Sequence, residues 1–121
     1  MKFKDKVTLS GVKPQILDIL PTVEPVFNTT PIGLTITCTT EGHPLNDPHT
    51  HGYAIDCRTH GLTSEAQDLL AATLQKTLGD EYFVQHEPQV VDDKGNVIKG
   101  EHLHIQLAKQ EWHKLVSEEQ P

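Results

Sequence analysis

The spacing of apolar residues predicts a helix near the N-terminus. After Pro14, apolar side chains recur every three or four positions, as they do on one face of a helix, at Ile16, Leu17, Ile19, Leu20, Val23 and Phe27. Pro14 suits the first helical turn, where an amide hydrogen has no partner within the helix. Pro21 and Pro25 lie inside the same stretch, so we expect them to kink or split this helix.

A second helix is predicted in the middle of the chain. Its apolar face would consist of Ala66, Leu69, Leu70, Leu74 and Leu78. Ser64 and Gln67 fit a capping box at its start. Gly79 fits the position directly after the helix, where the residue often has a positive φ. The charged segment from Lys109 to Pro121 predicts a short C-terminal helix that frays, with Trp112 packing it against the core.

Alternating apolar and polar residues predict strands between and after these helices, at 34–40, 53–58, 82–86 and 102–108. The segment 90–98 predicts a hairpin with its turn around 93–95. The segment 41–49 contains glycine and two prolines and predicts a loop. Two main helices packed on a small antiparallel sheet give an α+β fold, in a single domain over residues 1–121.

Composition narrows the possible partners. The chain has 121 residues, which suits one domain with a core, and a net charge of -7. No basic stripe exists to neutralise phosphates, so we expect no nucleic-acid partner. No run of about 18 apolar residues occurs, and residues 1–11 lack the apolar core of a signal peptide. We therefore expect synthesis in the cytoplasm, no membrane partner and a monomer.

Histidines gather in two short segments. Three of the eight histidines lie in 48–60, and two more lie beside a glutamate in 101–106. His49 and Asp56 are seven residues apart, so an extended chain would separate them by over about 20 Å. Gly52 lies between them and permits a tight reversal. Two imidazoles and one carboxylate are a common catalytic zinc set, because a fourth position stays open for water.

Two motifs resemble those of a known family. Residues 49–56 fit the pattern H-x-x-G-x-A-x-D, and residues 101–104 fit E-x-x-H. Together they resemble the LAS metallopeptidases, within them the D-Ala-D-Ala carboxypeptidase branch that includes phage L-Ala-D-Glu endopeptidases, and especially small prophage-encoded members. The order of elements fits from about residue 12 to 106. The resemblance implies a hedgehog/DD-peptidase-like fold.

The resemblance also implies one zinc ion and a role for each motif residue. His49, Asp56 and His104 would bind the zinc, and Glu101 would be the general base and acid. The substrate would be a D-amino-acid-containing peptide, either a peptidoglycan stem peptide or a D-Ala-D-Ala precursor. A carboxypeptidase, dipeptidase or endopeptidase reaction would fit, and a phage-type member would be released to the cell wall during lysis.

The chain departs from the family pattern in two places. The family often has an arginine shortly after the strand that precedes the first motif, and residues 36–42 contain no arginine. Asp47 stands where the family commonly has a serine or threonine. Arg58 shares a strand face with Asp56 and is a candidate replacement. The alternative for Arg58 is a simple ion pair with Asp56.

The remaining histidines and the two cysteines also have expected positions or roles. His51 is expected beside the metal site or against the substrate, and His102 is a second candidate for the base or for substrate binding, with a structural role as its alternative. We expect solvated surface positions for His43, His60, His86 and His113. Cys38 and Cys57 lie in strand-like segments, so we expect free, buried thiols rather than a disulfide or metal ligands.

A different class of function stays open. A zinc fold of the same type can serve as a non-catalytic binding module, as in hedgehog proteins. The missing arginine favours this alternative, and Glu101 favours an enzyme because a binding module needs no base. The pairs His49/His51 and His102/His104 can also build a four-histidine metal site, although the cupin-like barrels that use such pairs need more strands.

Overall fold

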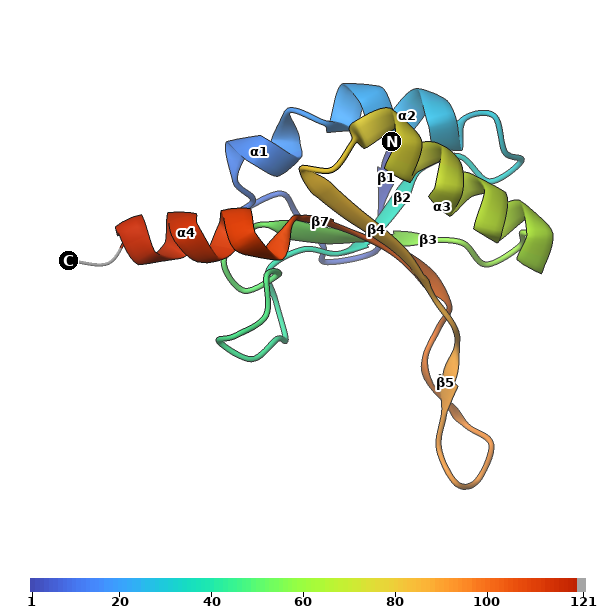
Figure 1. The fold of residues 1–121 in the computed structure, drawn as a ribbon. Coiled ribbons are helices and arrows are strands. Elements are labelled where there is room, and N and C mark those ends of the chain that lie inside the picture. The colour runs from blue at the N-terminus through green and yellow to red at the C-terminus, as the bar shows by residue number, and fades with distance from the viewer. Residues whose placement is uncertain (120–121) are drawn as a thin grey trace.

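A β-sheet forms the centre of the fold, and the computed structural model describes residues 1–119 apart from the Lys99 side chain. The strands of this sheet are β1 (Lys2–Phe3), β2 (Thr35–Cys38), β3 (Ala54–Arg58), β4 (Tyr82–Glu87) and β7 (His102–Leu107). Within the described residues they form a five-stranded sheet in the order β1-β2-β3-β7-β4 (Figure 1). The α+β class is confirmed.

The sheet was expected to be antiparallel throughout, but it contains one parallel pair of strands. β1 pairs with β2 in parallel, whereas the remaining pairs are antiparallel. The reason lies in the connection. The chain leaves β1, passes through helices and returns to the neighbouring strand in the same direction, which is the crossover that parallel strands require.

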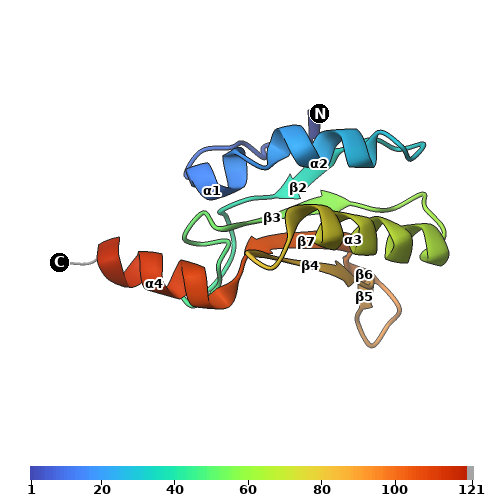
Figure 2. The same cartoon turned by 45° about the horizontal axis from the view of Figure 1, so that its top comes forward.

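Helices α1 (Pro14–Leu17), α2 (Leu20–Phe27) and α3 (Ser64–Leu78) cover one face of the sheet (Figures 1 and 2). The predicted N-terminal helix is split between α1 and α2, just before Pro21, and Pro25 stays inside α2. Pro21 lies in the first turn of α2, where a missing amide hydrogen costs no helical bond. α4 (Lys109–Glu119) continues from β7 at one end of the sheet. The fraying expected at Pro121 lies outside the described residues.

The start of α3 differs from the predicted capping box. Thr63 is the N-cap, and its side-chain oxygen accepts a hydrogen bond from the Ala66 amide at 3.1 Å. The Gln67 side chain donates instead to the Leu62 carbonyl at 2.9 Å. Gln67 is buried on the inner face of the helix, whereas Leu69 is 69% exposed, so Leu69 was wrongly assigned to that face. Gly79 ends α3 with a φ of 81° as expected.

The core lies between the helices and the sheet. Its fully buried side chains come from α1, α2, α3 and the central strands, and include Ile16, Val23, Phe27, Ile36, Ile55, Cys57, Leu74, Leu103 and Ile105. A second cluster of Tyr53, Leu107 and Trp112 holds α4 against the sheet, which confirms the expected role of Trp112. In the described residues no helix is long and apolar enough to cross a membrane.

A hairpin of β5 (Val90–Val91) and β6 (Val97–Lys99) projects from the sheet, as Figure 1 shows. The predicted turn is confirmed. Asp92 Oδ1 accepts hydrogen bonds from the Lys94 and Asn96 amides, and Gly95 has a φ of 82°.

Candidate metal centre

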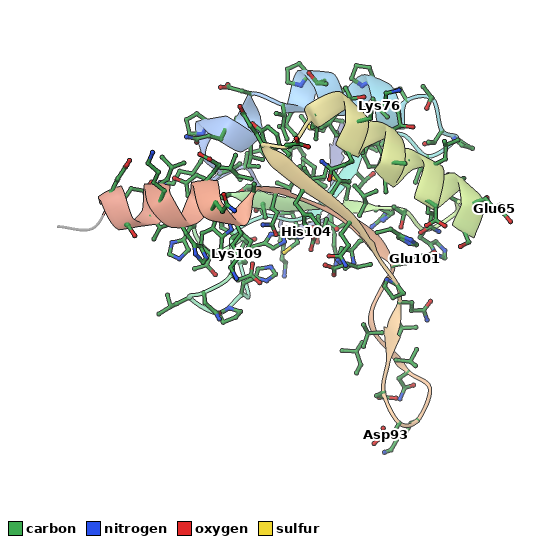
Figure 3. The ribbon with its side chains drawn as sticks, viewed as in Figure 1. Glu65, Lys76, Asp93, Glu101, His104 and Lys109 are labelled. Atoms are coloured by element: carbon green, nitrogen blue, oxygen red, sulfur yellow. The ribbon has the colours of Figure 1, made fainter. Side chains whose placement is uncertain are left out.

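Three ligand-type side chains converge on the face of the sheet that lies opposite α1, α2 and α3. Asp56 in β3 and His104 in β7 are direct cross-strand partners, so their side chains share a face. Their neighbours along the strands point the other way into the helical core. Figure 3 shows His104 on the side of the sheet away from the helices. His49 comes from the loop before β3, and all three residues are buried.

A tight turn brings His49 back over the sheet. The Gly52 amide donates to the His49 carbonyl at 3.0 Å, and Gly52 has a φ of 84°. A Cβ atom at position 52 would lie 2.1 Å from the Gly11 carbonyl oxygen, so only glycine fits there. Asp47 fixes the start of the turn, because its Oδ1 accepts from the His49 amide at 2.8 Å.

The three ligand atoms form a small triangle. Asp56 Oδ1 lies 3.1 Å from His49 Nε2 and 3.0 Å from His104 Nδ1, and the two nitrogens are 3.3 Å apart. Ligand atoms around a tetrahedral zinc ion, each about 2.0–2.1 Å from the metal, lie about 3.3–3.4 Å from one another. The buried His49, Asp56 and His104 therefore lie close enough to bind a metal ion together.

Neighbouring carbonyl groups determine which ring nitrogens carry protons. His49 Nδ1 lies 2.7 Å from the Thr39 carbonyl oxygen, and His104 Nε2 lies 2.8 Å from Gln106 Oε1. The Gln106 amide is oriented by its own nitrogen, which donates to the Leu107 carbonyl. Because both oxygens only accept, both nitrogens beside them must donate.

The consequence is that lone pairs face one another. With the protons on the outer nitrogens, His49 Nε2, His104 Nδ1 and Asp56 Oδ1 all point acceptor lone pairs into the same buried space. Three converging acceptors repel unless a cation lies between them. Metal-bound histidines commonly donate their second ring hydrogen to a carbonyl in this way. The donor pattern thus fits a metal ion.

In the absence of a metal, a proton supplies the missing positive charge. Burial raises the pKa of Asp56, but the hydrogen bonds that His104 and His49 donate when their inner nitrogens are protonated, together with the charge of His49, outweigh it and hold this pKa well below its usual range. Burial lowers the pKa of His104, yet the hydrogen bonds to Asp56 and Gln106 and the charge of Asp56 raise it overall. A metal ion would compete with this proton for the same position.

A second row of side chains lies next to the triangle on the same face. Arg58, His102 and Glu87 are cross-strand partners in β3, β7 and β4. His102 Nε2 lies 3.6 Å from Asp56 Oδ2 and 2.8 Å from Glu87 Oε2, although the approach to Glu87 lacks the direction of a hydrogen bond. Its Nδ1 lies 3.0 Å from the Gly100 carbonyl oxygen. His102 is thus buried between carboxylates beside the metal position.

Glu101 is placed at some distance from the triangle. It precedes β7, and its carboxylate accepts a hydrogen bond from Gln67 Nε2 at 3.1 Å and lies 3.6 Å from His60 Nδ1. Figure 3 shows Glu101 toward the hairpin end of the site and His104 nearer its centre. Both Glu101 and Arg58 line a cavity of about 490 Å³ that also reaches Asp56. The cavity therefore connects the candidate base to the metal position.

His51 does not join the three converging residues. Its ring stacks on Trp112 with a centroid distance of 5.9 Å, and its Nε2 lies 2.7 Å from the Leu45 carbonyl oxygen. In this position His51 ties the loop over residues 41–49 to α4. His60 and His113 are exposed as expected, whereas His86 is half-buried and lies 3.5 Å from Asp68.

His43 was expected at the solvated surface and Cys38 as a buried thiol, but both lie half-buried beside His49. The His43 ring stacks on the His49 ring at 4.1 Å, and His43 Nε2 lies 2.9 Å from Cys38 Sγ. Both side chains are half-buried and line the cavity. Cys57, by contrast, is buried in the core as expected, and no disulfide joins the two cysteines.

Comparison of the chain with protein-family models, with curated proteins and with solved structures gives no match.

Proposed function

We propose that this chain is a zinc-dependent peptidase with a hedgehog/DD-peptidase-like fold. The observation that carries the proposal is the buried triangle of His49, Asp56 and His104, whose lone pairs converge beside an open cavity. Two histidines and one carboxylate leave a fourth position open, which distinguishes a catalytic zinc site from a closed structural one. When bound, zinc would polarise a peptide carbonyl and lower the pKa of a bound water to about 7.

The residues around the cavity supply the remaining functions of a hydrolase. Glu101 would accept the proton of the attacking water and pass it to the leaving amine. In the present arrangement Gln67 and His60 hold its carboxylate, so Glu101 must turn toward Asp56 when substrate binds. His102 is the rival base, because it already lies 3.6 Å from the Asp56 carboxylate.

Arg58 would provide positive charge at the cavity. It lines the cavity from the end of β3, in the row next to Asp56. From there its guanidinium can bind a carbonyl oxygen or a carboxylate of the substrate. The proposed substrate is a peptide with D-amino acids, of the peptidoglycan stem or D-Ala-D-Ala type, and the motifs shared with phage-type enzymes support this choice. His51 would act indirectly, by holding the loop that carries His49.

A non-catalytic zinc-binding module of the same fold is the second candidate. The position of Glu101 favours it, because its carboxylate is bonded to Gln67 and is not among the groups that converge on the metal position. In such a module the cavity would bind a peptide without cutting it.

Hydrolysis assays separate the two candidates. Zinc-loaded protein purified without a histidine tag would be incubated with D-Ala-D-Ala and L-Ala-D-Glu peptides, and products measured by mass spectrometry. Glu101→Gln should keep its zinc and lose about 100- to 10,000-fold in rate. The matched control is Asp93→Asn, which removes an exposed carboxylate at the hairpin tip and should leave the rate unchanged. No cleavage by zinc-loaded wild type would favour the binding module, and loss of activity in His102→Ala but not in Glu101→Gln would assign the base to His102.

A further inference from the structure

An irregularity in β2 directs Cys38 toward the metal centre. Ile36 pairs with Cys57, but the next pair joins Cys38 to Asp56, so Thr37 is an extra residue in β2. Without this bulge Thr37 would stand opposite Asp56. Because bulges change which side chain faces a given side of a sheet, Cys38 instead shares the face of Asp56 and His104. The sheet thus adds a thiol to the row that contains two of the metal ligands.

His43 completes a pair of soft ligands with this thiol. Its Nε2 lies 2.9 Å from Cys38 Sγ, and its Nδ1 lies 3.5 Å from Asp47 Oδ2. Asp47 thereby orients the ring so that Nε2 faces the sulfur. Both side chains line the cavity, so an ion can reach them from solvent.

The stacking of His43 on His49 indicates that these rings serve different ions. The rings are nearly parallel, at 8° and 4.1 Å. An imidazole binds metal in the plane of its ring, so two parallel rings cannot direct lone pairs at one ion. They can hold two ions side by side, separated by about the ring spacing. Two-metal sites have ions about 3.5–4 Å apart, which agrees with this spacing.

We propose that Cys38 and His43 form a second metal position beside the His49–Asp56–His104 position. The ligand atoms of Cys38, His43 and His49 lie within 4.8 Å of one another, which keeps the two positions adjacent. A thiolate and an imidazole select a thiophilic divalent ion such as zinc, cobalt or cadmium. With two protein ligands rather than three, the second position binds more weakly. The proposal does not depend on peptidase activity.

Cobalt titration tests the proposal, because a cobalt–thiolate bond gives a charge-transfer absorption in the near ultraviolet and imidazole and carboxylate ligands do not. Metal-free wild-type protein would be titrated with cobalt while absorption and bound metal are measured. We expect the first equivalent to bind without this band and a weaker second equivalent to produce it. Cys38→Ser and His43→Ala should each bind the first equivalent only. His60→Ala removes an exposed histidine of the same cavity and should retain both equivalents.

Two results would overturn the proposal. A thiolate band that develops with the first equivalent would make Cys38 a fourth ligand of the first ion. Absence of the band at all cobalt concentrations would exclude a thiolate position altogether. Alkylation of wild-type protein gives an independent readout that needs no variant to fold, since Cys57 is buried in the core and only Cys38 should react. One equivalent of zinc should leave the Cys38 alkylation rate unchanged, and excess zinc should slow it.

Discussion

The hydrogen bond between Gln106 and His104 permits a sharp test of the proposed metal centre. Gln106 Oε1 accepts from His104 Nε2 at 2.8 Å and so leaves the lone pair of Nδ1 directed at Asp56. Gln106→Met removes this acceptor with little change in volume. The buried ring then loses the partner that selects its tautomer. Losing such a partner costs about 10- to 100-fold in metal affinity.

This loss of affinity converts into a measurable change in melting temperature. Zinc at about 100 times the wild-type dissociation constant stabilises the fold by about 2.7 kcal/mol, and a 100-fold loss of affinity leaves about 0.4 kcal/mol. A tenfold loss would leave about 1.4 kcal/mol. A domain of this length shifts by about 4 °C per kcal/mol. The zinc-induced rise in melting temperature should therefore be smaller in Gln106→Met by about 5–9 °C.

The assay compares each variant with and without zinc, so that effects on the metal-free fold cancel. Gln106→Glu keeps an acceptor for His104 and should retain tight binding. The control is Gln85→Met, because Gln85 is the exposed cross-strand neighbour of His104 and should behave as wild type. If Gln106→Met and wild type show the same zinc-induced rise, the assignment of the His104 tautomer is wrong.

Three further predictions concern stability. In zinc-free protein, the lowered pKa of Asp56 stabilises the fold at pH values above 3.8, the pKa of this carboxyl in the unfolded chain. The raised pKa of His104 stabilises the fold at pH values below 6.5, the pKa of this histidine in the unfolded chain, and the stabilisation is lost as the pH rises through the folded-state pKa. The zinc-induced rise in melting temperature should therefore grow as the pH rises from below 6.5 through the raised pKa of His104, and calorimetry showing no such growth would contradict the competition between proton and metal. Gly52→Ala should lower the free energy of unfolding by at least about 2 kcal/mol in denaturant titrations, because its φ is positive and a backbone oxygen blocks a Cβ; an unchanged midpoint would refute the turn. Thr63→Ala should cost about 1 kcal/mol and Ser64→Ala much less, since Thr63 caps α3, and equal losses would contradict the cap.

The sequence pattern was sufficient to predict the helices, the longer strands and the residues that converge, but not β1. Periodicity located α3, the split N-terminal helix and the longer strands, because each carries its own local pattern. His49, Asp56 and His104 were predictable as a group because a motif recorded their spacing and Gly52 marked the turn between the first two.

The remaining features depend on long-range pairing or on backbone detail. The bulge that turns Cys38 toward Asp56 leaves no trace in an alternating apolar pattern, and the stack of His43 on His49 follows from the path of a loop. Thr63 and Ser64 both carry a hydroxyl group, and only the backbone decides which one caps α3. The parallel pairing of β1 depends on a strand of two residues.

We propose that His49, Asp56 and His104 hold one tightly bound zinc ion. The most direct measurement is the zinc content of protein purified without a histidine tag, determined by mass spectrometry after dialysis against metal-free buffer. We expect about one equivalent in wild type and in His60→Ala, and almost none in His104→Ala. Two results would contradict this assignment. One is wild-type protein that contains no zinc and does not bind added zinc, and the other is His104→Ala that retains a full equivalent.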